Sequence, residues 1–319
     1  MRRRWGIYRL QKGGMNAMTQ NEVKFANLLA KIMMAIGGLG ALVTVVLRVW
    51  LTPGVISSTN GVLDSPWTVM GFMLLCLAAL VVLGFFTRGI RREVSGGPCV
   101  ALAASMLVAA VILVIAEIDD LLSAWDSNET MLLIQGILGV FSAVALVLLA
   151  WRLLSEGSTR RGMSQWTMLL PVLWMWMRVI NYEMSYASLA RVEDSFFGFA
   201  MLVFEMMFLF KLARYTAGVG QVRTGSMFFY SAATALFSLS GAAVKIIMYL
   251  LNDGMSVQAY DLAGAGDLAV GILALATGIT YLWGVEPEAP DEPSEEEVFP
   301  VEGELIMASD DTEPEESAT

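Results

Sequence analysis

Residues 98–118, PCVALAASMLVAAVILVIAEI, decide the fold, because they form one long apolar run with few polar side chains. Ser105 is the only hydroxyl-bearing residue in the run and Glu117 the only charged one. A helix needs about 20 predominantly apolar residues to cross the hydrocarbon region of a bilayer. The run therefore predicts a transmembrane helix.

Seven further stretches meet the same criterion. The eight predicted spans cover residues 28–51, 67–87, 98–118, 131–153, 165–186, 195–214, 226–251 and 260–283. The composition agrees, because 56% hydrophobic and only 16% charged residues are too apolar for a soluble domain of this length. We expect an all-α fold, a polytopic bundle of eight transmembrane helices embedded in a lipid bilayer.

The distribution of basic residues predicts the orientation of the bundle. Sixteen of the 20 Lys and Arg residues precede or open the first span or follow spans two, four and six, whereas the connections at 52–66, 119–130 and 252–259 contain none. The positive-inside rule then places both termini in the cytoplasm and the chain in the cell membrane. The acidic connection at 119–130 is expected to be a solvated outer loop.

The sequence divides into three parts: a cytoplasmic segment at 1–27, a transmembrane domain at 28–284 and a tail at 285–319. Residues 286–319 hold 14 acidic residues and no Lys or Arg, which predicts a disordered cytoplasmic tail. Apolar residues at 298–307 allow two interpretations, a docking motif for a cytoplasmic protein partner or a solubilising tail. Residues 1–14 end in Lys12-Gly13-Gly14 before Met15, which suggests a translated ribosome-binding site and a later natural start.

Several classes of chemistry lack their usual residues. The chain has no histidine, and Cys76 and Cys99 lie in or at the edge of apolar segments, where cysteine behaves as a small hydrophobe. We therefore expect no catalytic residues, no cofactor and no metal site, and the chain is not expected to be an enzyme or to bind nucleic acid.

Charged residues inside the predicted spans are the strongest functional signal, because a charge in the hydrocarbon region is costly and usually faces the bundle interior or a partner. The candidates inside the hydrocarbon core are Arg48, Arg178, Glu183, Glu205, Lys245 and Asp267. Glu117 and Asp261 lie at predicted outer ends. Three positive and three negative charges favour mutual neutralisation.

Counting depth at 1.5 Å per residue predicts two ion pairs between neighbouring spans. Lys245 lies roughly 9 Å and Asp267 roughly 11 to 13 Å below the outer boundary, so these two are expected to pair. Arg178 at roughly 12 Å and Glu205 at roughly 16 Å form the second expected pair. Asn181 shares a helix face with Arg178 and Trp174, which offers the guanidinium an amide neighbour and a stacking surface.

These charges admit two interpretations. Closed ion pairs would fix the register of the helices without any chemistry. A polar cavity open to the outside would instead let Glu205 or Asp267 bind a cation or a proton. The candidate polar sites are Arg178, Asn181, Glu205, Lys245 and Asp267.

Residues 169–218 carry a resemblance to known sequences. A Pro-opened aromatic helix with an arginine precedes a short polar loop and a Phe-rich helix that ends in an Ala-Arg pair and a glycine. These features correspond to Pro171, Trp174, Arg178, Phe204, Phe208, Phe210, Ala213, Arg214 and Gly218. The stretch resembles uncharacterised eight-span membrane proteins of Firmicutes-type bacteria, which implies the topology and a bacterial plasma membrane but no activity.

Two functions follow as hypotheses. The first is a non-enzymatic membrane protein with a regulatory or scaffolding role, which presents its tail to a cytoplasmic partner. The alternative is a small-solute or ion permease that uses the charges in the outer half of the membrane. Substrate and oligomeric state are left open by the sequence.

Overall fold

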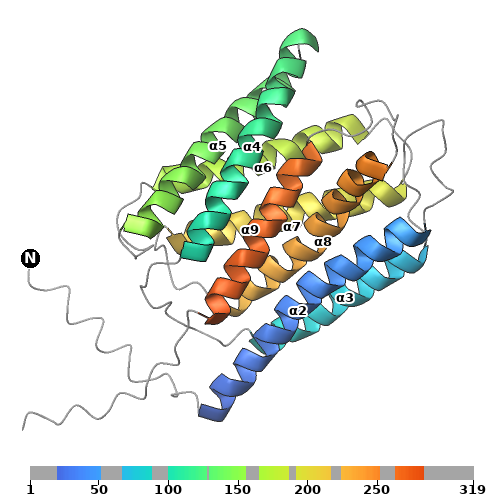
Figure 1. Cartoon of the computed structure of the whole chain (residues 1–319), viewed down its shortest axis with the longest axis vertical. Helices are drawn as coiled ribbons and strands as arrows, with labels where there is room; N and C mark the ends of the chain where they lie inside the picture. The colour runs from blue at the N-terminus through green and yellow to red at the C-terminus, as the bar shows by residue number, and fades with distance from the viewer. Residues whose placement is uncertain are drawn as a thin grey trace, which may run out of the picture. The chain divides into compact units, whose positions relative to one another are not determined.

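The computed structural model describes residues 20–51, 67–87, 100–127, 129–155, 165–186, 192–216, 224–251 and 263–283, which all lie in one unit, Met1–Val285. Apart from Glu129, these residues are helical and include no strand, as the all-α prediction requires (Figure 1). The helices are α2 (Gln20–Leu51), α3 (Trp67–Thr87), α4 (Val100–Ser127), α5 (Thr130–Ser155), α6 (Gln165–Tyr186), α7 (Val192–Thr216), α8 (Thr224–Leu251) and α9 (Ala263–Trp283).

Each helix coincides with a predicted span, but α4 is longer than expected. It continues through the acidic residues to Ser127, and α5 begins at Thr130, so the predicted outer loop at 119–130 is wrong as a loop. Its solvation is as expected, since Asp119, Asp126 and Glu129 are exposed. Acidic side chains can remain helical where they reach solvent, which hydropathy alone cannot show.

Successive helices run in opposite directions. Contacts at close-packed positions show this, because Gly139 of α5 lies against Glu117 of α4, whereas Gly136, one turn earlier, lies against Leu121, one turn later. Likewise, Gly271 and Gly278 of α9 lie against Ser238 and Ser231 of α8. The bundle is therefore an up-and-down arrangement in which α2, α4, α6 and α8 end at the same side.

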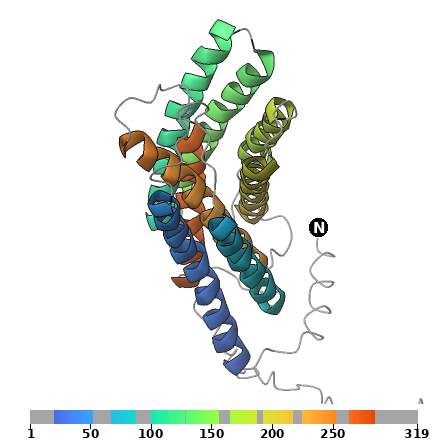
Figure 2. The same cartoon turned by 90° about the vertical axis from the view of Figure 1, so that its right-hand side faces the viewer.

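Helices α8 and α9 lie between the α2–α3 pair and the α4–α5 pair (Figures 1 and 2). Their packing depends on small residues, because α8 is buried from Ser231 to Ser238 and carries no large side chain at its closest contact. At that contact, a Cβ added to Gly37 of α2 would lie 2.7 Å from the backbone oxygen of Ala232. Such small-residue contacts are the usual means by which membrane helices approach closely.

Within the described residues, five helical stretches are long and apolar enough to cross a membrane: Asn27–Trp50, Thr68–Thr87, Val100–Ser127, Thr130–Ser155 and Gly225–Val244. They lie in α2, α3, α4, α5 and α8. The other three described helices, α6, α7 and α9, carry Arg178, Glu205 and Asp267, respectively. Of these three, α9 differs from the five in length, because its apolar stretch, Gly264–Thr280, is shorter.

Several predictions fall on residues outside the described ranges. They are residues 1–14, the rest of the N-terminal segment up to residue 19, the acidic tail at 285–319, Asp261 and the side chain of Lys245.

Candidate functional site

Arg178 of α6 lies at the centre of a buried polar cluster. Its Nη1 donates a hydrogen bond to Asp267 Oδ1 of α9 at 2.5 Å and lies 3.8 Å from Glu205 Oε2 of α7. All three residues are buried, and Glu205 has no exposed surface. The predicted pair of Arg178 with Glu205 is confirmed, although Asp267 is the closer partner.

Asp267 has a partner that the sequence did not predict. Sequence neighbours on α8 and α9 suggested Lys245, whereas the structure shows the Arg178 guanidinium bonded to Asp267 from α6. Among the described residues, α6 has close backbone contacts with α5 and α7 but not with α9. The long Arg178 side chain therefore reaches Asp267 although the backbones of α6 and α9 are not in close contact. A contact of Lys245 stays a prediction, because its side chain lies outside the described set.

Glu117 of α4 lies in the same region as this cluster. The sequence had placed it at an outer helix end. Because α4 continues for ten residues beyond it, about 15 Å of helix, Glu117 lies inside the bundle. Only 3% of its surface is exposed, and its Oε1 accepts a hydrogen bond of 2.8 Å from Trp174 Nε1 of α6. The Trp174 ring also lies 5.2 Å from the Arg178 guanidinium carbon, so the predicted stacking surface is confirmed.

Asn181 lies one helical turn beyond Arg178 and belongs to a second polar layer. Its Nδ2 donates to Gln135 Oε1 of α5 at 2.7 Å, and Gln135 Nε2 donates to Asp120 Oδ2 of α4 at 3.3 Å. Asp120 is partly exposed, and Glu183 of α6 is exposed, as expected from its position near the helix end. The layer therefore connects the buried cluster to the end of the bundle where α4 meets α5.

Among the described side chains, the cluster holds more carboxylates than cations. Three carboxylates, those of Glu117, Glu205 and Asp267, surround one guanidinium among the side chains that the structure describes. In this set, neither oxygen of Glu205 has a hydrogen-bond partner, and neither does Glu117 Oε2. The Ser238 hydroxyl of α8 lies beside Glu205 as a potential donor, although the pair does not reach full hydrogen-bond geometry in this structure. An ionised carboxylate buried without such bonds costs several kcal/mol.

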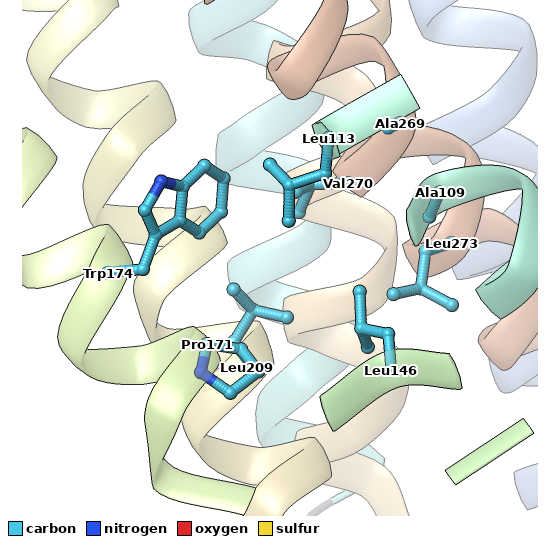
Figure 3. A pocket seen from close by; sticks show the side chains of 9 residues that line it. All are labelled: Ala109, Leu113, Leu146, Pro171, Trp174, Leu209, Ala269, Val270 and Leu273. Carbon is cyan, nitrogen blue, oxygen red and sulfur yellow. The ribbon is translucent and has the colours of Figure 1, made fainter. Parts of the chain in front are cut away.

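An apolar layer closes the opposite side of the cluster. It surrounds a small pocket that is lined by Ala109, Leu113, Leu146, Pro171, Trp174, Leu209, Ala269, Val270 and Leu273. Figure 3 shows the Trp174 indole extending from α6 toward Leu113 and Val270. The pocket volume of about 10 Å³ suits one water molecule at most. Trp174 thus belongs to both layers, with its N–H on Glu117 and its ring against the pocket.

No group of three or more His, Cys, Asp or Glu side chains with the proximity that a metal ion needs occurs in the described part of the chain. No family model matches the sequence, and no curated protein or solved structure is similar to it.

Proposed function

We propose that the chain is a proton-coupled permease for small solutes, with the Arg178, Glu205 and Asp267 cluster as the coupling site. The observation that supports this most strongly is Glu205, which is fully buried, lacks hydrogen bonds among the described residues and shares one guanidinium with Asp267. A proton would remove the cost of its buried charge. A carboxyl group that alternates between charged and neutral forms is the basic device of intramembrane proton relays.

A proton suits this site better than a metal ion does. The Arg178 guanidinium lies 3.8 Å from Glu205 and would repel a second cation, whereas protonation simply makes the carboxyl group neutral. A metal ion also needs several oxygen ligands, and Glu205 shares no metal-type cluster with other described side chains.

The two layers beside the cluster support a transport cycle with access from one side. The Asp120, Gln135 and Asn181 layer supplies polar groups toward the α4–α5 end, while the layer with Trp174 and Leu209 on the other side is mainly apolar. Alternating access requires such an asymmetry at any one moment of the cycle. The structure would then correspond to a state closed at the apolar layer.

We also propose that all eight helices cross a bacterial plasma membrane, with both termini in the cytoplasm. Helices α6, α7 and α9 contain 22, 25 and 21 residues, enough for the hydrocarbon thickness at about 20 residues per span. Their charges face one another inside the bundle and so are kept away from the lipid. The distribution of Lys and Arg places the α4–α5 end outside.

Purified protein in liposomes that contain a pH-sensitive dye tests the transport proposal. Panels of amino acids, carboxylic acids and sugars are added under an imposed pH gradient, and solute-dependent proton movement is recorded. Glu205→Gln should abolish this movement, and Glu183→Gln, at an exposed site on α6, should preserve it. Proton movement by Glu205→Gln at the wild-type rate would contradict the proposal.

The regulatory or scaffolding hypothesis depends on the tail, which lies outside the described residues. Truncation after Gly284 separates the two functions. A permease should keep its solute-dependent proton movement without the tail, because the cluster lies on α6, α7 and α9. A scaffold should lose its cellular phenotype while the helical unit still inserts.

A further inference from the structure

Glu117 has the features of a proton-binding site separate from Glu205. It lies on α4, has 3% of its surface exposed, and has two carboxylate oxygens in different surroundings. Oε1 accepts the Trp174 N–H, whereas Oε2 is buried and has no hydrogen-bond partner among the described residues. One indole N–H replaces only a fraction of the hydration that an ionised carboxylate loses on burial.

The packing on α5 leaves a space that fits this side chain closely. A Cβ added to Gly139 would lie 2.3 Å from Glu117 Cγ and 2.6 Å from its Oε2, so only glycine admits the carboxyl group here. Gly136 accommodates Leu121 in the same way one turn further along α4. The carboxyl group of Glu117 is therefore held in a fixed position between α4 and α5 and cannot turn freely toward water.

The charges around Glu117 do not stabilise its ionised form well. Arg178 of α6 attracts it, but the Arg178 Nη1 is already bonded to Asp267 of α9, and Asp267 itself repels Glu117. Asp120 repels it from the next turn of α4. Helix α5 has a single charged residue, Arg152, which lies 13 residues from Gly139, about 20 Å along the helix.

We propose that Glu117 is a second proton-binding site, which holds one proton on Oε2 while Oε1 accepts the Trp174 N–H. The proton comes from water at the α4–α5 end, where Asp120 is partly exposed three residues from Glu117, about 4.5 Å along the helix. Transfer from hydronium forms the Oε2–H bond and leaves water and a neutral carboxyl group. The role of this site in transport rests on the proposed function, but the binding of the proton does not.

Infrared difference spectroscopy of the full-length protein in liposomes tests the assignment. A protonated carboxyl group has a C=O stretch that an ionised one lacks, and carbon-13 labelling of glutamate shifts the bands of Glu but not those of Asp. Above about pH 6, where exposed glutamates are ionised, we expect a label-sensitive carboxylic acid band in the wild type, one component of which is lost in Glu117→Gln and retained in Glu183→Gln and Glu205→Gln. The glutamine keeps an oxygen that can accept the Trp174 N–H.

Two results would overturn the proposal. One is a wild-type spectrum without any label-sensitive carboxylic acid band above about pH 6, where exposed glutamates are ionised, a measurement that needs no variant. The other is a folded Glu117→Gln protein whose spectrum equals that of the wild type. The proton movement of Glu205→Gln in liposomes separates this site from the coupling site. A band component lost in Glu117→Gln together with normal proton movement in Glu205→Gln would support the Glu117 site and contradict the permease.

Discussion

Replacement of Arg178 by glutamine should destabilise the protein more than any other single loss of charge in the cluster. The guanidinium serves two buried carboxylates, Asp267 at 2.5 Å and Glu205 at 3.8 Å. At an effective dielectric constant of about 20, unit charges 3.8 Å apart attract by about 4 kcal/mol before desolvation is counted. Removal of one member of a buried ion pair costs about 3–5 kcal/mol in practice, which is our expected loss for Arg178→Gln.

The free energy of unfolding, measured by denaturant titration of the protein in mild detergent, checks this value. Arg214→Gln is the matched control, because Arg214 is exposed on α7 and its loss should change stability by less than about 0.5 kcal/mol. The double variant Arg178→Gln/Asp267→Asn should regain a large part of the loss, since it removes one of the stranded charges. A loss below about 1 kcal/mol for Arg178→Gln, or no recovery in the double variant, would refute the reasoning.

Two packing predictions use the same unfolding measurement. Gly139→Ala should cost about 1–3 kcal/mol, because the new methyl group would lie 2.3 Å from Glu117 Cγ, whereas Gly71→Ala, with no atom within 4 Å, should be neutral or slightly stabilising. Equal effects of the two glycine variants would contradict the packing of α4 on α5. Trp174→Phe should cost about 1–3 kcal/mol, because it removes the N–H that donates to Glu117. Trp176→Phe, at an exposed site, is the control and should cost little. A neutral Trp174→Phe would count against the hydrogen bond.

The sequence predicted the helices well because apolar runs of membrane length are a strong and local signal. The bounds of α3 and α6 agree with the predicted spans at both ends. Depth counting also placed Arg178 and Glu205 at similar levels, since rise per residue is nearly constant along a helix. Both successes depend on distances measured along a single helix or across one short connection.

The partner of Asp267 could not be predicted in the same way. Lys245 was chosen because α8 and α9 are consecutive, but Arg178 reaches Asp267 from α6, with which α9 has no close backbone contact in the described part of the chain. The order of helices around a bundle is a tertiary property. The reach of an arginine side chain makes such pairings longer in range than helix contacts suggest.

Glu117 was missed as an interior residue because hydropathy ended its span at residue 118. A signal was nevertheless present, since Met106, Ala110, Leu113 and Glu117 follow helical spacing along one face, and all four are buried. The inclusion of Glu117 also changes the charge argument. Equal numbers of positive and negative residues suggested mutual neutralisation, whereas the described cluster has three carboxylates for one guanidinium.

The central claim is that the carboxyl group of Glu205 carries the transported proton, and side-by-side flux measurements on Glu205→Asp and Glu205→Gln test it most directly. Both variants remain buried between α6, α8 and α9, but only aspartate can bind and release a proton. In liposomes with an imposed pH gradient, we predict solute-dependent proton movement with Glu205→Asp and none with Glu205→Gln. Equal proton movement by the two variants would contradict the account.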